Sequence, residues 1–304
     1  MKKIVVIGSL NMDFAVNVKH APKVGETILG DDFRLTPGGK GANQAYAAAK
    51  LGGKVTMLGA IGDDTYGQML MDNLRNAGVC VDYLKKTKDS STGMALITVD
   101  ENSDNSIVVI QGANKEVDIP YIDSMLDIIK DCDIVIFQLE IPVETVAYAA
   151  RRAKEFGKTV ILDPAPAQCD LPQELLENAD VIKPNENEIL TLLGADDSLA
   201  LDNAVGLLRE KGAKNILVTL GADGSCYYGQ DGSEIHVPAN KVKAVDTTGA
   251  GDSYTAAFAV NLSEKKDIKS AMKFASRVGA MAVMKAGAQT SIPTREEVEL
   301  WAEA

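Results

Sequence analysis

Two common phosphate-binding motifs are absent from this sequence. No G-x-x-x-x-G-K-[ST] pattern occurs, because Lys40 follows Gly39 but Gly41 comes next, and Arg34 stands where the first glycine would be. No G-x-G-x-x-G pattern follows a predicted strand either. The chain is therefore neither a P-loop protein nor a simple dinucleotide-binding fold, and any phosphate must be held in another way.

Cysteine and histidine are also scarce. The sequence has two histidines, and four cysteines that form no C-x-x-C pair: His20, His236, Cys80, Cys132, Cys169 and Cys226. This pattern argues against a disulfide framework, a cysteine zinc site and a histidine-rich metal site. It predicts a protein of the reducing cytoplasm.

Long apolar runs and a surplus of basic residues are missing as well. The run Ile4–Ile7 ends at Gly8 and Ser9 with no small-residue cleavage site behind it, which favours a buried strand over a secretory signal. No run approaches the roughly 18 apolar residues that a membrane helix needs. With 31 basic and 43 acidic residues the net charge is −12. Such a surface repels phosphate backbones and anionic lipid, so we expect no nucleic-acid or membrane partner.

What the sequence does contain is a steady alternation of short apolar runs and helical patterns. The predicted strands are Ile4–Ile7, Val55–Ile61, Ile134–Leu139, Thr159–Leu162, Val181–Lys183 and Ile216–Thr219. The predicted helices are Ala42–Leu51, Gly67–Ala77, Val143–Phe156, Leu199–Lys211, Asp252–Leu262, Lys266–Lys285 and Thr294–Ala302, the last opening with a capping-box pattern. This order predicts an α/β fold with a doubly wound, mostly parallel central sheet flanked by helices. We expect a single domain over residues 1–304, with ligands at the carboxyl ends of the strands.

Two stretches interrupt this rhythm. Residues 13–36 contain the β-rich runs Phe14–Val18 and Thr27–Leu29, and residues 92–111 read as a hairpin of Met94–Val99 and Ser106–Ile110. Neither stretch has the helix that a parallel crossover requires. We interpret residues 12–40 and 90–113 as a small β-sheet lid. The alternative is an ordinary antiparallel extension of the main sheet.

The strongest local signal for chemistry is the run Asp246-Thr247-Thr248-Gly249-Ala250-Gly251-Asp252 ahead of a helix of small residues. Small residues at a helix start let backbone N–H groups converge on an anion, and the helix dipole adds to the attraction. Residues 249–251 could thus stabilise a phosphoryl group during transfer, with Asp252 as the general base. The alternative is a tight turn with Asp252 as the helix N-cap.

A second signal is Gly38-Gly39-Lys40-Gly41-Ala42-Asn43, which leads into a helix. Together with Asn11, Asp13 and Glu140, which follow predicted strands, it predicts a ring of polar groups at strand ends. Amide, carboxylate and ammonium groups suit a polyhydroxylated ligand, because each sugar hydroxyl both donates and accepts hydrogen bonds. For Asn11, Asp13 and Glu140 taken singly, loop capping is the alternative.

Two further motifs end predicted strands. In Lys183-Pro184-Asn185-Glu186-Asn187-Glu188, Glu188 could hold Mg²⁺ through water, or Asn185 and Glu188 could form a capping box. The segment Thr219-Leu220-Gly221-Ala222-Asp223-Gly224 could wrap a nucleotide or form a plain β-turn. The order of four motifs at strand ends is what predicts a phosphoryl-transfer site.

These motifs resemble those of the ribokinase-like carbohydrate kinases over essentially the full length of the chain. The likeness rests on residues 38–43 with Gly52 and Gly62 behind them, on Asp246–Asp252, and on the opening Gly8-Ser9-Leu10-Asn11-Met12-Asp13. It implies transfer of the ATP γ-phosphoryl group to the O5 hydroxyl of D-ribose, with Asp252 as base and Gly249, Ala250 and Gly251 around the phosphoryl group. It also implies a homodimer formed through the β lid.

The resemblance assigns the remaining roles as well. It implies sugar contacts from Asn11, Asp13, Gly39, Lys40, Asn43 and Glu140. It implies ATP contacts from Asn185, Thr219, Leu220, Gly221, Ala222, Asp223, Gly224 and Gly251, with Ser276 where a larger residue is expected near the adenine. Glu188 would organise Mg²⁺, and a K⁺ activator would lie among Asp246, Thr248, Ala282, Lys285, Gly287 and Ser291. Competing interpretations are a kinase for deoxyribose, a ketose or a nucleoside, and a non-catalytic sugar sensor.

Overall fold

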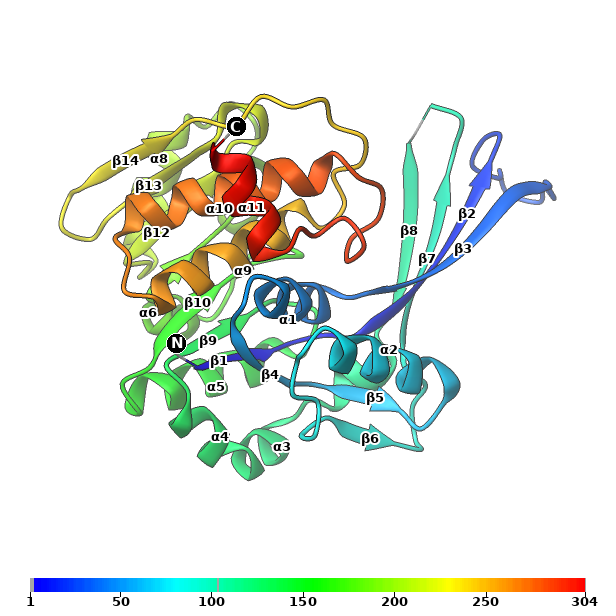
Figure 1. Ribbon diagram of the computed structural model, residues 1–304, viewed down its shortest axis with the longest axis horizontal. Helices are drawn as coiled ribbons and strands as arrows, with labels where there is room; N and C mark the ends of the chain where they lie inside the picture. The colour runs from blue at the N-terminus through cyan, green and yellow to red at the C-terminus, as the bar shows by residue number, and fades with distance from the viewer. Residues whose placement is uncertain (1–2, 103, 304) are drawn as a thin grey trace.

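The computed structural model of the chain describes residues 3–102 and 104–303, and its largest sheet has eight strands. Their order is β14 (Glu234–Val237), β13 (Ser225–Tyr228), β12 (Asn215–Thr219), β11 (Val181–Ile182), β10 (Thr159–Leu162), β9 (Ile134–Phe137), β1 (Lys3–Ile7) and β4 (Lys54–Leu58). Neighbours from β4 to β12 run parallel, whereas β13 and β14 are antiparallel. The predicted α/β fold with a mostly parallel central sheet is confirmed (Figure 1).

Helices cover both faces of this sheet. One face carries α1 (Lys40–Lys50), α2 (Thr65–Asn76), α9 (Ala250–Ser263), α10 (Ile268–Val283) and α11 (Arg295–Glu303). The other carries α3 (Ile119–Ser124), α4 (Leu126–Asp131), α5 (Val143–Glu155), α6 (Gln173–Asn178), α7 (Glu186–Leu193) and α8 (Leu201–Glu210). Alternate side chains of β1 enter the two cores, with Ile4 and Val6 in one and Val5 and Ile7 in the other. The near-continuous apolar strands follow from this double burial.

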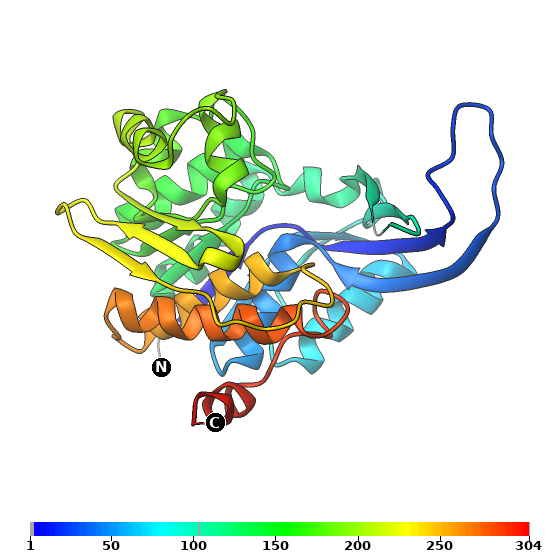
Figure 2. The ribbon, with the colours of Figure 1, turned by 90° about the horizontal axis from the view of Figure 1, so that it is seen from above.

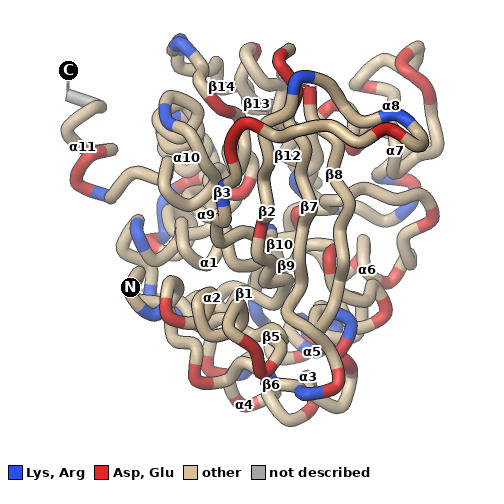
Figure 3. The backbone as a smooth tube through the Cα atoms, turned by 90° about the vertical axis from the view of Figure 1, so that its right-hand side faces the viewer, with Lys and Arg blue, Asp and Glu red and all other residues tan. Residues whose placement is uncertain are grey.

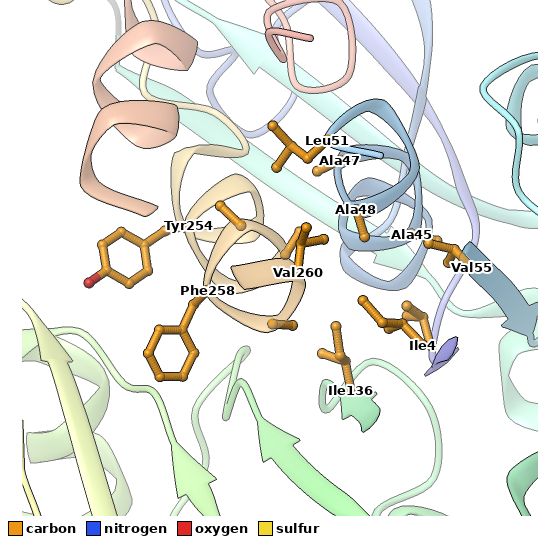
Figure 4. Close-up of a cluster of buried hydrophobic side chains, with 14 of the residues drawn as sticks. Ile4, Ala45, Ala47, Ala48, Leu51, Val55, Ile136, Tyr254, Phe258 and Val260 are labelled. Atoms are coloured by element: carbon orange, nitrogen blue, oxygen red, sulfur yellow. The ribbon is translucent and has the colours of Figure 1, made fainter. Parts of the chain in front are cut away.

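Helix α9 is the central helix of the first core. Its residues from Asp252 to Asn261 are all buried, and Phe258 and Val260 are 1% and 0% exposed. Figure 4 shows Val260 on the side of α9 that faces the alanines of α1, above Ile4 and Ile136 of the sheet, with Tyr254 and Phe258 on the other side of the helix. Small side chains on α1 let the two helices pack closely. The start of α9 is therefore fixed at the carboxyl ends of the strands.

A separate four-stranded sheet, sheet B, projects from the body (Figures 1 and 2). Its order is β3 (Gly30–Gly38), β2 (Asn11–Val18), β7 (Gly93–Val99) and β8 (Asn105–Ile110), with β2 and β7 parallel. The predicted hairpin is confirmed as β7 and β8, and sheet B is not an extension of the main sheet. The β-rich run Thr27–Leu29 forms no strand, since β2 ends at Val18 and β3 begins at Gly30.

Other corrections concern element ends. The expected strand Val55–Ile61 is two strands, β4 and then β5 (Ala60–Gly62), which pairs with β6 (Lys85–Thr87) in a small sheet of its own. The chain leaves the main sheet at Gly59, where a Cβ would lie 2.6 Å from Leu10 Cδ1. The flanking residues on both sides are apolar, so the pattern did not reveal the break.

Two short 3₁₀ helices complete the chain, η1 (Gly112–Glu116) and η2 (Gly221–Asp223). The predicted capping box at α11 is confirmed, since Thr294 N donates to Glu297 Oε2 at 2.6 Å and Glu297 N donates to Thr294 Oγ1 at 3.2 Å. Within residues 3–102 and 104–303, no helix is both long enough and apolar enough to cross a membrane.

Candidate active site

Asp252 lies in the first turn of α9, at the carboxyl edge of the main sheet. The N-cap is Gly249, whose φ of 73° is left-handed and where a Cβ would lie 3.1 Å from Ala288 Cα. Glycine is therefore required there, and the interpretation of Asp252 as N-cap is wrong. Helix α9 begins two residues earlier than expected, so the N–H groups of Gly251 and Asp252 lie in a first turn, where no intrahelical acceptor exists. Such a turn favours a bound anion.

Four side-chain amides, which we call the amide cluster, orient the Asp252 carboxylate: Asn43, Gln44, Gln138 and Gln289. Asn43 Nδ2 donates to Asp252 Oδ2 at 2.9 Å, and Gln44 Nε2 donates to Asp252 Oδ1 at 3.0 Å. Gln289 donates to Asn43 Oδ1 at 3.0 Å and Gln138 donates to Gln44 Oε1 at 2.6 Å, which turns both amide NH₂ groups toward Asp252. The plane of the carboxylate is thus fixed by two donors that are themselves fixed.

A second buried carboxylate, Asp163, lies directly after β10. Its Oδ2 accepts from Gln44 Nε2 at 2.8 Å and from Thr255 Oγ1 at 3.1 Å, and lies 3.3 Å from Lys183 Nζ. Burial raises the pKa of Asp163 to about 6, against the opposing attraction of Lys183 and Lys40. Its other oxygen, Oδ1, has no partner among residues 3–102 and 104–303.

The expected polar groups at strand ends come together beside Asp252, and we call Asn11, Asp13, Lys40 and Glu140 the polar ring. Glu140 Oε2 accepts from the Lys40 backbone N–H at 3.0 Å and also bonds to Ser9 Oγ. Asn11 Oδ1 accepts from Asn114 Nδ2 at 2.7 Å. The capping alternative therefore holds for Glu140, which caps the first residue of α1, and not for Asn11, which lies in β2.

Two charged groups of the polar ring, Asp13 and Lys40, have raised pKa values. Burial, followed by the neighbouring carboxylates Glu140 and Asp252, raises the pKa of Asp13 to about 7. The nearby carboxylates, Asp252 first, raise the pKa of the Lys40 ammonium against the effect of its burial. Gly39 permits this crowding, because its φ is +87° and a Cβ would lie 2.7 Å from Asn11 N. Charged groups of both signs thus surround one small space.

A cavity of about 860 Å³ opens from Asp252 and Lys40 along the strand ends. Its lining contains most of the residues expected to bind nucleotide: Asn185, Thr219, Gly221, Ala222, Gly224, Gly251 and Ser276, with Glu188 beside them. Leu220 instead packs against the core, and Asp223 is not part of the lining. Among the expected sugar ligands only Lys40 lines this cavity, so the polar ring meets the cavity at Lys40 beside Asp252, and its other members lie outside the lining.

The structural alternatives, a capping box and a turn, also hold for the 183–188 and 219–224 motifs in this lining. Asn185 and Glu188 form a reciprocal capping box, with both bonds at 2.8 Å, which uses Glu188 Oε2. Leu220 N donates to Gly224 O at 2.8 Å and closes a turn between β12 and β13. Ser276 Oγ accepts from Asn240 Nδ2 at 3.0 Å. Both motifs are structural caps or turns that at the same time face the cavity.

The residues expected around a monovalent cation lie on two adjacent segments. Asp246 joins them, since its Oδ1 accepts from Thr248 N at 2.9 Å and its Oδ2 accepts from Gly287 N at 2.8 Å. Ala282 O accepts from Lys285 N at 3.2 Å, and Ser291 Oγ donates to Ala288 O at 3.0 Å. In the described part of the chain no three His, Cys, Asp or Glu side chains gather as a metal site would require.

Sequence reasoning missed several buried residues of the site: Gln44, Asp163, Lys183 as a charged group, Gln138 and Gln289. Asp163 and Lys183 end the strands β10 and β11, so the rule that ligands lie at strand carboxyl ends could have found them. Gln44 follows Asn43 on α1, and it belongs to no sequence motif that would have marked it as a site residue. Gln289 lies far along the chain, and only the tertiary structure brings it to Asn43.

Comparison with known proteins agrees with this geometry. The sequence model of the pfkB family carbohydrate kinases matches residues 1–295. The chain belongs to that family. A ribokinase of Bacillus subtilis (strain 168) is 43% identical over 299 residues, covering 98% of this chain and 99% of the relative. A deoxyribokinase of Salmonella typhi is 40% identical over 296 residues, covering 97% of this chain and 96% of the relative.

Solved structures of the pfkB family carbohydrate kinases include close matches to the fold. The structure of Arabidopsis thaliana ribokinase complexed with ribose and ATP has a TM-score of 0.92 at 34% identity, covering 100% of this chain and 99% of that one. Thermotoga maritima ribokinase has a TM-score of 0.91 at 38% identity, with both chains covered completely. The chain is thus a sugar kinase with the ribokinase-like α/β fold and its separate small sheet.

Proposed function

We propose that this sugar kinase transfers the γ-phosphoryl group of ATP to the O5 hydroxyl of D-ribose, giving ribose 5-phosphate and ADP. The observation that carries the proposal is the position of Asp252, which two amides hold where the polar ring meets the cavity. The ribokinase relatives and the ribose and ATP complex of one of them support the substrates. The polar ring supplies both donors and acceptors for sugar hydroxyls.

In the proposed mechanism Asp252 is the general base. The bond between the γ-phosphorus and the ADP oxygen breaks, a bond from phosphorus to the sugar oxygen forms, and Asp252 accepts the hydroxyl proton. An aspartate suffices because a loose transition state needs little early deprotonation. Residues 249–251 and the free N–H groups of the first turn of α9 face the developing negative charge. The sugar binds first, beneath the lid that residues 12–40 and 90–113 form around sheet B. ATP then fills the outer cavity.

A carboxylate on the cavity wall suits Mg²⁺, and the segments joined by Asp246 suit K⁺. Mg²⁺ is usually held by one or two carboxylates together with phosphates and water, and Glu188 supplies a carboxylate on the cavity wall. When bound, the ion would screen the phosphate charge. For K⁺ we propose the shell of Asp246, Thr248, Ala282, Lys285, Gly287 and Ser291, acting mostly through backbone oxygens. The bond from Gly287 to Asp246 supports it, because it brings the two segments together.

A second candidate substrate is deoxyribose. Deoxyribokinase relatives at 40% identity are nearly as similar to this chain as the ribokinase at 43%. The two sugars differ by one hydroxyl, and a site built to bond that hydroxyl rejects an analogue without it strongly.

The experiment for both candidates is coupled ADP release with ribose, deoxyribose, fructose and adenosine, in potassium and then in sodium buffer. Ribose-dependent turnover that rises with potassium is the expected result. Preference for another compound of the panel would make that compound the substrate in place of ribose and would leave the proposed mechanism unchanged. Turnover on none of the four, with sugar still bound in calorimetry, would favour the sensor interpretation.

We also propose a cytoplasmic homodimer formed through sheet B. Strand β8 is an edge strand with all six residues exposed, and its Ile107 and Val108 are 52% and 61% exposed. Strands β7 and β8 carry no charged residue, as Figure 3 shows from the side of this sheet. Apolar edges of this kind rarely face water alone. The four cysteines are free thiols, as a reducing compartment would keep them.

Val108→Lys should convert the proposed dimer to a monomer, because an ammonium would be buried at the interface. Light scattering after gel filtration gives the mass directly. A wild-type mass of one chain at micromolar concentration would contradict the dimer proposal, and an unchanged dimer in the variant would exclude β8 as its interface.

A further inference from the structure

Two ammonium groups, Lys40 and Lys183, face the inner end of the cavity. Both line it, and the Lys183 Nζ forms an ion pair with Asp163 Oδ2 at 3.3 Å. The Lys183 side chain is 5% exposed. An ammonium carries three N–H donors, and one ion pair with a carboxylate leaves donors free to bind a ligand. The donors of Lys183 thus point to an anionic ligand in the cavity.

The ion pair with Asp163 does not satisfy Lys183. Its Nζ lies 3.3 Å from Asp163 Oδ2, an oxygen that already accepts hydrogen bonds from Gln44 and Thr255. The pair Lys154–Asp180 elsewhere in the chain is different. There Nζ donates to both carboxylate oxygens at 2.7 and 2.8 Å and to Lys158 O at 3.2 Å. Lys154–Asp180 is a closed structural pair, whereas Lys183–Asp163 is open toward the cavity.

The position of Lys183 indicates which anion it binds. Its Nζ lies 3.5 Å from the point that a Cβ on Gly251 would occupy. Gly251 contributes a first-turn N–H at the positive end of α9, and Asp252 is the next residue. The ammonium and the start of α9 therefore converge on one place beside the proposed base. An anion there would be the group undergoing transfer.

We propose that Lys183 is a further catalytic residue, which binds the terminal phosphoryl group of the nucleotide and stabilises its charge during transfer. The proposal rests on the proposed phosphoryl transfer. Lys183 remains protonated throughout: the bond to ADP breaks, the bond to the sugar oxygen forms, and the proton goes to Asp252. Asp163 is then a positioning residue, which holds Lys183 at the carboxyl end of β11.

The test compares nucleotide binding and turnover in Lys183→Met with those in wild type. Calorimetry should show ATP affinity lowered by about 10- to 100-fold and ADP affinity by less than about threefold, because only ATP has the terminal phosphate. Turnover should fall by about 100-fold or more. Lys183→Arg, which keeps the charge, should recover part of both.

Two further variants separate catalysis from stability. Lys154→Met makes the same chemical change at a closed pair outside the cavity lining, and it should lower thermal stability with no change in the ratio of ATP to ADP affinity. Lys183→Met combined with Asp163→Asn removes both buried charges, so it should regain stability without regaining turnover.

The proposal is overturned if Lys183→Met weakens ATP and ADP equally, or if the double variant recovers wild-type turnover. Either result would make the pair purely structural. Absence of sugar-dependent turnover in wild type would instead contradict the proposed function. The ratio of ATP to ADP affinity would still report on Lys183 in that case, because it needs no sugar.

Discussion

The polar ring and the cavity, which meet at Lys40 and Asp252, are built differently. The polar ring consists of charged and amide side chains, several of them bonded to one another or to buried neighbours such as Asn114. The cavity wall beyond it combines polar side chains such as Lys183 and Asn185 with many glycines and alanines, among them those of the 219–224 turn and the start of α9. The polar ring offers many side-chain functions in a small space, and the cavity adds backbone groups and shape to its side chains.

This difference predicts where substitutions matter. A single side chain of the polar ring or the amide cluster holds neighbours in place, so its removal disturbs several groups at once. A backbone N–H on the cavity wall survives a side-chain change. Substitutions should therefore be severe in the polar ring and the amide cluster, and mild on the cavity wall wherever backbone groups line it, with Lys183 as the exception.

The largest effect is expected where the polar ring and the cavity meet. Asp252→Asn removes the proposed base and keeps the shape, so turnover should fall by roughly 10³-fold. Ribose affinity, measured by calorimetry, should change little. Near-full activity in this variant would mean that another group accepts the proton.

The next effect concerns the amide cluster. Gln44→Leu removes one donor from Asp252 and one from Asp163, so turnover should fall by about 10- to 100-fold with less change in the KM for ATP. Gln44→Glu has the same size but adds a third buried carboxylate, and it should be worse. If both variants kept wild-type turnover, the orientation of Asp252 would not depend on Gln44.

A smaller effect is expected from pH. Folding raises the pKa of Asp13 to about 7, so between pH 4 and pH 7 the folded state binds more protons than the unfolded state, and Asp13 makes the free energy of unfolding fall as pH rises. Asp13→Asn removes this contribution. From pH 4 to pH 8 the variant should gain roughly 1–3 kcal/mol relative to wild type in urea unfolding. Parallel curves for the two proteins would contradict the raised pKa.

The smallest effect is expected on the cavity wall. The Ser276 hydroxyl is already bonded to Asn240, so Ser276→Ala should change the KM for ATP by less than about threefold. Steady-state kinetics with saturating sugar would measure it. A tenfold change would show that this wall also recognises its ligand through side chains.

Much of this arrangement could be predicted from local patterns. Strand ends, glycine turns and the position of Asp252 are encoded within a few residues, so the parallel sheet and most of the cavity wall follow from the sequence. The link from Gln289 to Asn43 joins residues 246 positions apart, and no local pattern encodes such a contact. The break at Gly59 could not be predicted for a different reason: the residues on both sides of it are apolar and have the local pattern of a single strand.

The course of β2 has a mechanical consequence. This strand leaves the core at Leu10, carries Asn11 and Asp13, and then becomes an inner strand of sheet B between β3 and β7. Any swing of sheet B about the residues before Leu10 must move Asn11 and Asp13 with it. Sheet B and these two side chains of the polar ring therefore move as one unit, so a displacement at the far end of the sheet would shift the polar ring.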